Sequence, residues 1–212
     1  MTSIPVVIID YGIGNLKSIQ NMVKKVGGKA EISSDPEKIK NAEKLILPGV
    51  GAFDQGMSTL RDSGLIDVLN KEVIDHKKCI LGICLGAQIM TRGSEEGQIK
   101  GLGWFDADTI KFNFPSETSL KIPHMGWNEI KIKKNTPLTS ELSDDSRFYF
   151  VHSYHFKCDN NEDVLTESRY GYNFTSAMHR GNIYAAQFHP EKSHKFGMTM
   201  MKNFLNLQCE KN

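Results

Sequence analysis

Residues 78–88 read KCILGICLGAQ, and they contain the strongest structural signal in the chain. An apolar run ends in Gly-x-Cys-x-Gly, the pattern of a sharp turn between a buried strand and a helix, with Cys84 at its tip. The flanking glycines allow the tight turn and leave room beside the thiol for a substrate. The pattern predicts a strand at residues 79–83 and a nucleophilic sulfur where that strand ends.

Short apolar runs alternate with helical periodicity throughout the N-terminal half. Strands are predicted at residues 6–9, 30–32 and 44–47, and helices at residues 16–26, 54–60 and 65–74. Continuous apolar strands separated by helices favour a parallel sheet that is covered on both faces.

The C-terminal half has a different pattern. Aromatic and β-branched runs predict further, partly antiparallel strands at residues 104–112, 127–132, 148–151, 174–178 and 183–188. A polar loop is expected at residues 159–163 and an amphipathic helix at residues 196–207. We therefore expect an α/β fold with an open, mostly parallel central sheet, flanking helices and added antiparallel strands. Since the chain shows no internal repeat or linker, residues 1–212 are predicted to form a single domain.

The composition excludes several functional classes. The chain has 212 residues, a net charge of +1, 24% charged residues and 39% hydrophobic residues. Lysine and arginine are scattered rather than gathered in a patch, which argues against a nucleic-acid partner. The N-terminus lacks a signal-peptide pattern, and no apolar run approaches the roughly 20 residues that span a bilayer. We expect a cytoplasmic protein with no nucleic acid and no membrane as a partner.

The four cysteines, at positions 79, 84, 158 and 209, have no spacing typical of a zinc site. A disulfide framework is not expected in a chain of this size without an export signal, so all four are predicted to be free thiols. Cys84 is the reactive one, and the others are interpreted as core residues. The Gly12-x-Gly14 turn has Lys17 where a dinucleotide fingerprint requires its third glycine. The sequence therefore predicts neither a metal nor a cofactor.

A second stretch, QFHPEK at residues 187–192, contains the partners that a thiol nucleophile needs. His189 can carry a proton to and from the sulfur, and Glu191 can orient the ring and stabilise the imidazolium. A free thiol has a pKa of roughly 8.5, so a nearby imidazole and a helix N-terminus favour the thiolate of Cys84. Nucleophile, base and orienting carboxylate together predict covalent acyl transfer. Three other histidines, His124, His152 and His155, compete for the role of base.

The oxyanion of such a reaction needs backbone donors. The N–H of Leu85 is one candidate, because this residue directly follows the nucleophile. The second is expected from Val50 and Gly51, in the glycine-containing loop at residues 48–51, where a peptide can rotate into place. Since an oxyanion donor lowers the barrier by about 3–4 kcal/mol, we expect this loop to act as a switch.

Taken together, these motifs resemble the class I (triad) glutamine amidotransferases and, more narrowly, the glutaminase subunits of imidazole glycerol phosphate synthase, whose fold is flavodoxin-like. The resemblance runs essentially from end to end. Its motifs are DYGxGNL at residues 10–16, LPGVGAF at 47–53, GICLG at 82–86, PHMGWN at 123–128, FVHSY at 150–154 and QFHPEKS at 187–193. One departure is Ala87, where the family usually has methionine.

The resemblance implies that Cys84 attacks the side-chain amide of L-glutamine and that ammonia leaves with a proton from His189. Water then releases glutamate from the thioester. The resemblance also implies a set of residues that bind glutamine, namely Gly49, Gln88, Glu96, Ser153 and Tyr154.

A separate acceptor subunit is also implied. A (β/α)8 barrel takes about 250 residues, more than this chain has, so the synthase must be another polypeptide. The family partner is a cyclase barrel that forms a heterodimer with the glutaminase and uses ammonia to make imidazole glycerol phosphate for histidine biosynthesis. The expected partner-facing residues are Asn15, Pro123, His124, Met125, Gly126, Trp127 and Asn128.

Three alternatives stay open. A paralogous amidotransferase–cyclase pair supplies ammonia for amidine groups on surface-polysaccharide sugars, and residues 103–108, 154–155, 171–174 and 193–197 resemble that branch. A stand-alone cysteine hydrolase or chaperone on a similar sheet would share the elbow but has no need of the PHMGWN segment. A non-enzymatic binding module would have no need of the triad.

Overall fold

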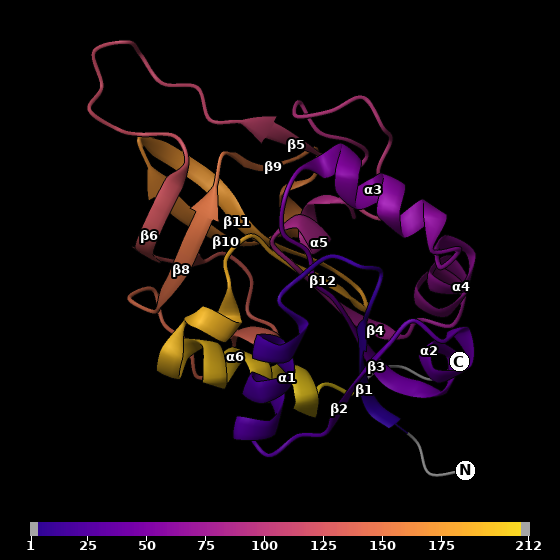
Figure 1. Ribbon diagram of the computed structural model, residues 1–212. Coiled ribbons are helices and arrows are strands. Elements are labelled where there is room, and N and C mark those ends of the chain that lie inside the picture. The colour runs from indigo at the N-terminus through magenta and orange to yellow at the C-terminus, as the bar shows by residue number, and fades with distance from the viewer. Residues whose placement is uncertain (1–3, 209–212) are drawn as a thin grey trace.

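The computed structural model describes residues 4–208. Four parallel strands form the N-terminal part of its central sheet (Figure 1), in the order β2-β1-β3-β4. Their bounds are Ile4–Ile9 for β1, Ala30–Ser33 for β2, Ala42–Leu47 for β3 and Cys79–Ile83 for β4. Each of the four strands predicted in this half is therefore confirmed.

Helices cover both faces of the sheet. On one side lie α1 (Leu16–Lys25) and α6 (His194–Asn206), which are neighbours in Figure 1. The other side is covered by α2 (Pro36–Asn41), α3 (Phe53–Asp62), α4 (Ile66–Asn70) and the π-helical turn Lys71–Asp75. Alternate residues of β1 enter different cores, Val6 and Ile8 toward α1 and Val7 and Ile9 toward α3. This two-sided burial explains the continuous apolar strands.

The C-terminal half extends the same sheet with antiparallel strands. Strand β12 (Ile183–Ala186) pairs in parallel with β4, and the sheet then continues antiparallel through β11 (Tyr172–Arg180), β10 (Val164–Tyr170) and β7 (Lys131–Ile132). A branch adds β9 (Tyr154–Cys158) and β5 (Ala107–Lys111) beside β11. The predicted α/β architecture, with a mostly parallel core and added antiparallel strands, is confirmed.

A separate two-stranded sheet stands apart from this layer. It consists of the antiparallel strands β6 (His124–Glu129) and β8 (Arg147–His152). We call this pair the β6–β8 hairpin, although β7 lies between the two strands in the sequence. Phe148 and Phe150 of β8 are fully buried in the core beneath it. The loop that connects β5 to β6 extends away from the body of the molecule (Figure 1).

Several elements differ from the prediction. The strand expected at residues 104–112 begins only at Ala107, because the N–H groups of Trp104 and Phe105 both donate to the carbonyl of Met90 and bend the chain there. The strand expected at 127–132 is divided at Ile130, where the chain passes from the hairpin into the main sheet. Helix α2 and strands β9 and β10 were not predicted, because these segments are short or largely polar.

The cysteines also correct the prediction in part. Cys84 and Cys158 are free thiols. Cys79 is disulfide-bonded, so the expectation of a free thiol at this position is wrong. The prediction relied on chain length and export signals, which carry no information about which side chains meet in space. Cys209 lies outside the described residues. None of the helices within residues 4–208 is long and apolar enough to cross a membrane.

Candidate active site

The turn at Cys84 has the geometry of a nucleophile elbow. Cys84 follows β4 with φ 53° and ψ −114°, a left-handed backbone that a non-glycine residue rarely adopts. A Cβ on Gly86 would lie 1.9 Å from the carbonyl oxygen of Leu47, so only glycine fits beside the end of β3. The helix that follows, α5 (Leu85–Gln88), is a single turn, so its dipole contributes less to the thiolate than the sequence suggested.

His189 is held against this elbow by its backbone. Its N–H donates to the carbonyl of Tyr149 in β8 (2.9 Å), and its carbonyl accepts from the hydroxyl of Ser193 (2.6 Å). The ring nitrogen Nδ1 lies 2.8 Å from Oε1 of Glu191, which leaves Nε2 for the hydrogen bond with Cys84. The side chains of His189 and Glu191 are almost completely buried. Cys84, His189 and Glu191 therefore lie together in the order that a triad requires.

The electrostatics of the two free thiols differ. Burial opposes the charged form of His189, but the hydrogen bonds and charges of Cys84 and Glu191 outweigh it and raise the pKa of this histidine to about 9. A protonated ring beside Cys84 favours the thiolate, the form that acts as a nucleophile. At Cys158, in contrast, burial and then the charge of Asp163 raise the pKa of the thiol to about 12. Of the two free thiols within residues 4–208, Cys84 is therefore the one whose surroundings suit a reaction.

Cys84 and His189 open into a pocket of about 340 Å³. The pocket wall includes most of the residues that the sequence assigns to the site: Val50, Gly51, Cys84, Gln88, Glu96, Ser153, Tyr154 and His189. Val151 and Lys192 also line it, although the sequence reasoning did not assign them. Gly49 and Leu85 lie behind this wall, where a Cβ on Gly49 would come within 2.6 Å of the nitrogen of Gly86.

The loop at residues 48–51 is fixed on both sides of an exposed centre. The hydroxyl of Tyr11 donates to the carbonyl of Pro48 (2.7 Å), and a carboxylate oxygen of Glu96 accepts from the N–H of Phe53 at the start of α3 (2.8 Å). Between these anchors Val50 is 43% exposed, and Gly51 has φ +103°. The backbone of Val50 and Gly51 thus borders the pocket at a position where a peptide has room to rotate.

The sequence reasoning also missed the role of Gln187, a fully buried residue beside the sulfur. Its side-chain nitrogen lies 3.8 Å from Sγ of Cys84, and its oxygen accepts from the amide of Gln88 (3.0 Å). The available signal was the spacing within QFHPEK, since residues 187 and 189 point to the same side of an extended chain. Gln187 therefore links the nucleophile to a residue that lines the pocket.

The three rival histidines form their own hydrogen bonds. His124 and His152 are bonded to each other, and His155 bonds to the hydroxyl of Tyr172 and the carbonyl of Phe156. Burial lowers the pKa of all three. His152 lines the pocket, but its two ring nitrogens contact His124 and the carbonyl of Tyr154. His189 is therefore the histidine whose geometry suits the base.

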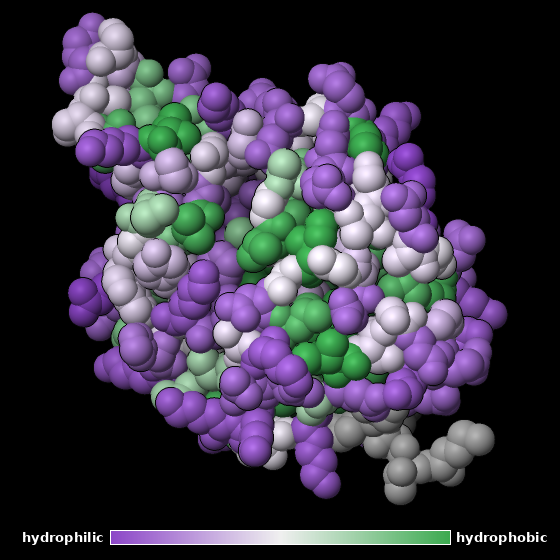
Figure 2. Space-filling model, in the orientation of Figure 1, coloured by the Kyte–Doolittle hydropathy of each residue, from purple (hydrophilic) through white to green (hydrophobic). Residues whose placement is uncertain are grey.

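The residues expected to face a partner divide between two sides of the hairpin. Met125 is 61% exposed and Trp127 is 47% exposed, and Pro123 and Asn15 are also on the surface. His124, however, is buried, and Gly126 and Asn128 are only partly exposed, because alternate residues of a strand face opposite sides. Figure 2 shows apolar patches on this side of the molecule, including one over the hairpin. Among the hairpin residues expected to face a partner, Pro123, Met125 and Trp127 are therefore the exposed ones.

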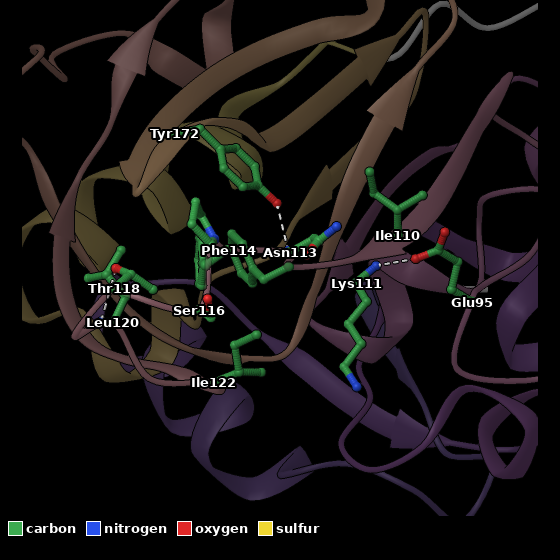
Figure 3. Close-up of a pocket in the computed structure, with 12 residues that line it drawn as sticks. Glu95, Ile110, Lys111, Asn113, Phe114, Ser116, Thr118, Leu120, Ile122 and Tyr172 are labelled. Atoms are coloured by element: carbon green, nitrogen blue, oxygen red, sulfur yellow. Dashed lines mark hydrogen bonds between the residues drawn. The ribbon is translucent and has the colours of Figure 1, made fainter.

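A larger hollow lies under the loop between β5 and β6 (Figure 3). It has a volume of about 930 Å³ and is lined by both apolar or aromatic and polar side chains. The hydroxyl of Tyr172 accepts there from the N–H of Asn113, and Glu95 accepts from the N–H of Lys111. Its lining contains neither a cysteine nor a histidine, so the smaller pocket is the candidate active site.

Comparisons with known proteins show the family of this chain. The family model for glutamine amidotransferase class-I matches residues 7–207. The chain is 53% identical over 200 residues to imidazole glycerol phosphate synthase subunit HisH 2 of Methanococcus maripaludis, covering 94% of this chain and 98% of the relative. It is 51% identical over 202 residues to the HisH 2 subunit of Pseudomonas aeruginosa, covering 95% and 99%.

Solved structures show the same fold at low sequence identity. A chain of PurLQS from Thermotoga maritima superposes with a TM-score of 0.71 at 18% identity, covering 97% of this chain and 99% of the other. The predicted resemblance is thus confirmed, and the chain belongs to the glutamine amidotransferase class-I family.

Proposed function

We propose that this chain is the glutaminase subunit of an imidazole glycerol phosphate synthase and hydrolyses L-glutamine to glutamate and ammonia. The observation that carries the proposal is His189, which bridges the thiol of Cys84 and the carboxylate of Glu191 at the edge of the 340 Å³ pocket. The HisH subunits, which are related over nearly their whole length, support the assignment to this synthase. The proposed compartment is the cytoplasm.

The reaction follows from the positions of the three side chains. The thiolate of Cys84 attacks the amide carbon of glutamine, and the oxyanion accepts hydrogen bonds from the N–H of Leu85 and from a peptide at Val50 or Gly51. As the carbon–nitrogen bond breaks, His189 gives its proton to the nitrogen, and ammonia leaves. Water then adds to the thioester and returns a proton to His189, and glutamate departs as the carbon–sulfur bond breaks. Glu191 holds the ring throughout.

The residues around the sulfur supply the binding site in this proposal. Gln88, Glu96, Ser153 and Tyr154 lie on the pocket wall, where their polar groups can bind the glutamine side chain and its charged α-substituents. Gly49 contributes the close approach of the loop to the elbow. No metal or cofactor takes part in these steps.

A cyclase of the (β/α)8-barrel type is the proposed partner, and the pair forms a heterodimer. Pro123, on the exposed hairpin face, also lines the pocket at Cys84, so a partner seated on this face and on Asn15 can receive ammonia before it escapes into water. Exposed apolar side chains such as Met125 and Trp127 are typical of protein interfaces.

The proposal is tested with Cys84→Ala in the complex. Glutamine hydrolysis should fall by at least about a thousandfold, because loss of the nucleophile leaves only binding and the oxyanion donors. Synthesis from free ammonium salt should continue, since the acceptor site is intact. Glutaminase turnover close to wild type would contradict the triad, and vigorous turnover by the isolated subunit would contradict the coupling to a partner.

A second candidate pathway is favoured by one observation. Two related proteins at 53% and 51% identity are named subunit HisH 2, a name that distinguishes them from another HisH subunit in the same organism. A duplicated subunit can supply ammonia for amidination of a surface-polysaccharide sugar while the triad stays the same. Growth of a histidine auxotroph that carries this gene together with its cyclase supports histidine biosynthesis, and failure to grow with an active glutaminase supports the second pathway.

A further inference from the structure

The inner face of the β6–β8 hairpin carries polar side chains beside the buried Phe148 and Phe150, although it is turned toward the protein interior. His124 of β6 pairs directly with His152 of β8, and both imidazoles are buried. Asn128 lies four residues further along β6, on the same face. Buried polar groups normally find hydrogen-bond partners, and these three find one another.

The three side chains form a continuous chain of hydrogen bonds. The amide nitrogen of Asn128 lies 3.2 Å from Nε2 of His124. Nδ1 of His124 lies 2.9 Å from Nε2 of His152, and Nδ1 of His152 lies 2.6 Å from the carbonyl oxygen of Tyr154. We call this set the Asn128–Tyr154 chain.

The direction of donation along the chain is fixed by its ends. A backbone carbonyl only accepts, so Nδ1 of His152 carries the proton of that ring. Burial lowers the pKa of His152 to about 3 and that of His124 to about 4, so both rings are neutral at pH 7. Nε2 of His152 must then accept from Nδ1 of His124, and Nε2 of His124 must accept from Asn128. Protonation of either ring would remove one acceptor and break the chain.

The Asn128–Tyr154 chain connects the hairpin to the main sheet. Ser153 is the single residue between β8, which belongs to the hairpin, and β9, which belongs to the main sheet. The bond from His152 to Tyr154 spans this joint. At the other end, Asn128 also donates to the carbonyl of Arg169 in β10 (2.9 Å). The chain therefore ties the hairpin to two strands of the main sheet.

The joint is also a wall of the candidate active site. Val151, His152, Ser153 and Tyr154 all line the pocket beside Cys84. On the outer face of the same hairpin, Met125 and Trp127 are exposed. Three hydrogen bonds thus link β6 to the pocket wall that faces glutamine. A partner that displaces β6 would move this wall through them.

We propose that the Asn128–Tyr154 chain positions the Ser153–Tyr154 wall of the glutamine pocket and transmits the placement of the β6–β8 hairpin to it. His124 and His152 are positioning residues, since they act on the substrate through the backbone of residues 153 and 154. The inference rests on the proposed function for the identity of the ligand, but the hydrogen bonds themselves are independent of it.

The alternative role for His124 is packing alone. Its ring stacks on Tyr170 (4.1 Å between centroids) and on Phe150 (4.9 Å), so a large truncation would remove both packing and hydrogen bonds. His124→Phe keeps an aromatic ring of similar size and removes both nitrogens, so it isolates the hydrogen bonds. His155→Phe is the matched control, because His155 is equally buried nearby and bonds only to Tyr172 and Phe156 among the contacts described for its ring nitrogens.

The first measurement is the tautomer of each ring in the wild-type full chain, from nitrogen-15 and proton NMR at pH 7. We expect neutral imidazoles with the proton on Nδ1 in both His124 and His152. A proton on Nε2 of His152, or a protonated ring at either position, overturns the proposal. This measurement needs neither substrate nor partner. It therefore tests whether the hydrogen bonds of the Asn128–Tyr154 chain exist even where the proposed function fails.

The second measurement is labelling of Cys84 by a diazoketone analogue of glutamine. The half-saturating concentration reports binding, and the maximal rate reports the chemistry of the thiol. In His124→Phe we expect roughly a five- to tenfold higher half-saturating concentration and a maximal rate within about twofold of wild type. Asn128→Ala removes the first donor of the chain and the bond to the carbonyl of Arg169. It should raise the half-saturating concentration by about threefold, and it serves where His124→Phe does not fold.

Two outcomes of the labelling overturn the positioning role. One is an unchanged half-saturating concentration in both His124→Phe and Asn128→Ala. The other is an equal increase in His155→Phe, which would show a general response to the loss of any buried imidazole. If the analogue does not label the wild-type protein at all, the proposed glutaminase activity is contradicted instead. The tautomers of His124 and His152 then test the hydrogen bonds of the Asn128–Tyr154 chain.

Discussion

The nucleophile and the wall opposite it are held in place by different means. Cys84 stands at the end of a parallel strand that is fully enclosed, and its position is set by steric crowding between Gly86 and Leu47. The Ser153–Tyr154 wall stands at a joint between two sheets, and its position is set by directional hydrogen bonds. Crowding leaves one arrangement, whereas a hydrogen-bonded joint can change its angle at modest cost. The parallel half therefore fixes the chemistry, and the antiparallel half is the part that a partner can adjust.

The largest effect is expected from Glu191→Gln, which removes the carboxylate that links the two halves through His189. The turnover number for glutamine should fall by about 10³- to 10⁴-fold, because a neutral amide does not stabilise the imidazolium or hold its tautomer. Steady-state kinetics of the complex measure it, with Glu162→Gln, an exposed carboxylate outside β6 and outside the pocket, as the control. A loss below tenfold would mean that the orientation of the ring does not depend on Glu191.

Gly86→Ala tests whether crowding holds the nucleophile. The added Cβ would lie 1.9 Å from the carbonyl oxygen of Leu47, so the end of β3 or the elbow must move. We expect the free energy of unfolding to fall by about 3 kcal/mol, as for other overpacked cores. Urea denaturation measures this change.

Gly93→Ala is the control for that experiment, since a Cβ at Gly93 meets no atom within 4 Å and its φ is not in the left-handed region. Its unfolding free energy should stay within about 0.5 kcal/mol of wild type. Equal stabilities of the two variants would show that the elbow is less tightly enclosed than the structure indicates.

Trp127→Ala tests whether the exposed face of the β6–β8 hairpin, in the antiparallel half, binds the partner. The affinity for the cyclase should fall by about ten- to a hundredfold, because large aromatic side chains often dominate interfaces. The isolated chain should lose less than about 1 kcal/mol of stability, since this side chain is half exposed. Ile74→Ala removes an exposed apolar side chain from a different segment of the chain and should leave the affinity unchanged. Calorimetric titration distinguishes these results, and an unaltered affinity in Trp127→Ala would exclude this face.

The smallest effect is a pH dependence of stability that originates in the triad. The pKa of His189 is raised to about 9, above its ordinary value of roughly 6.5. The protonated ring therefore contributes stability that is complete below about pH 6.5 and is lost as the pH rises toward 9. Wild type should lose more stability over this range than Cys84→Ala, which lacks one partner of the ring. Identical slopes in urea denaturation would contradict the raised pKa.

The sequence predicted the parallel half well because its signals are local. The elbow at Cys84 depends on two glycines, one two residues before it and one two residues after it, and the buried strands appear as continuous apolar runs. Short windows of sequence were therefore sufficient. The same windows placed His189 and Glu191 two residues apart at the end of a strand. They contained no information on the distance from His189 to Cys84, which depends on β12 pairing beside β4.

The antiparallel half was predicted less completely, for physical reasons. Two of the buried positions of strand β10 are occupied by the polar residues Thr166 and Ser168, so its hydrophobic signal is weak. The break at Ile130 arises because the residues before it pair with β8 in the hairpin, whereas the residues after it pair with β10 in the main sheet. His124 was expected at the surface because its motif matched a partner-facing segment. The alternation of β6 places it inside, where it bonds to His152.

The two tryptophans of the chain occupy opposite environments, with a practical consequence. Trp104 is buried and donates from its ring nitrogen to Asn70 (2.8 Å), whereas Trp127 lies half exposed against the ring of His194. Intrinsic fluorescence thus contains one shielded emitter and one that senses the solvent at β6. A protein that covers the hairpin should shift the emission of Trp127 to shorter wavelengths and leave that of Trp104 constant, which makes complex formation visible without any added dye.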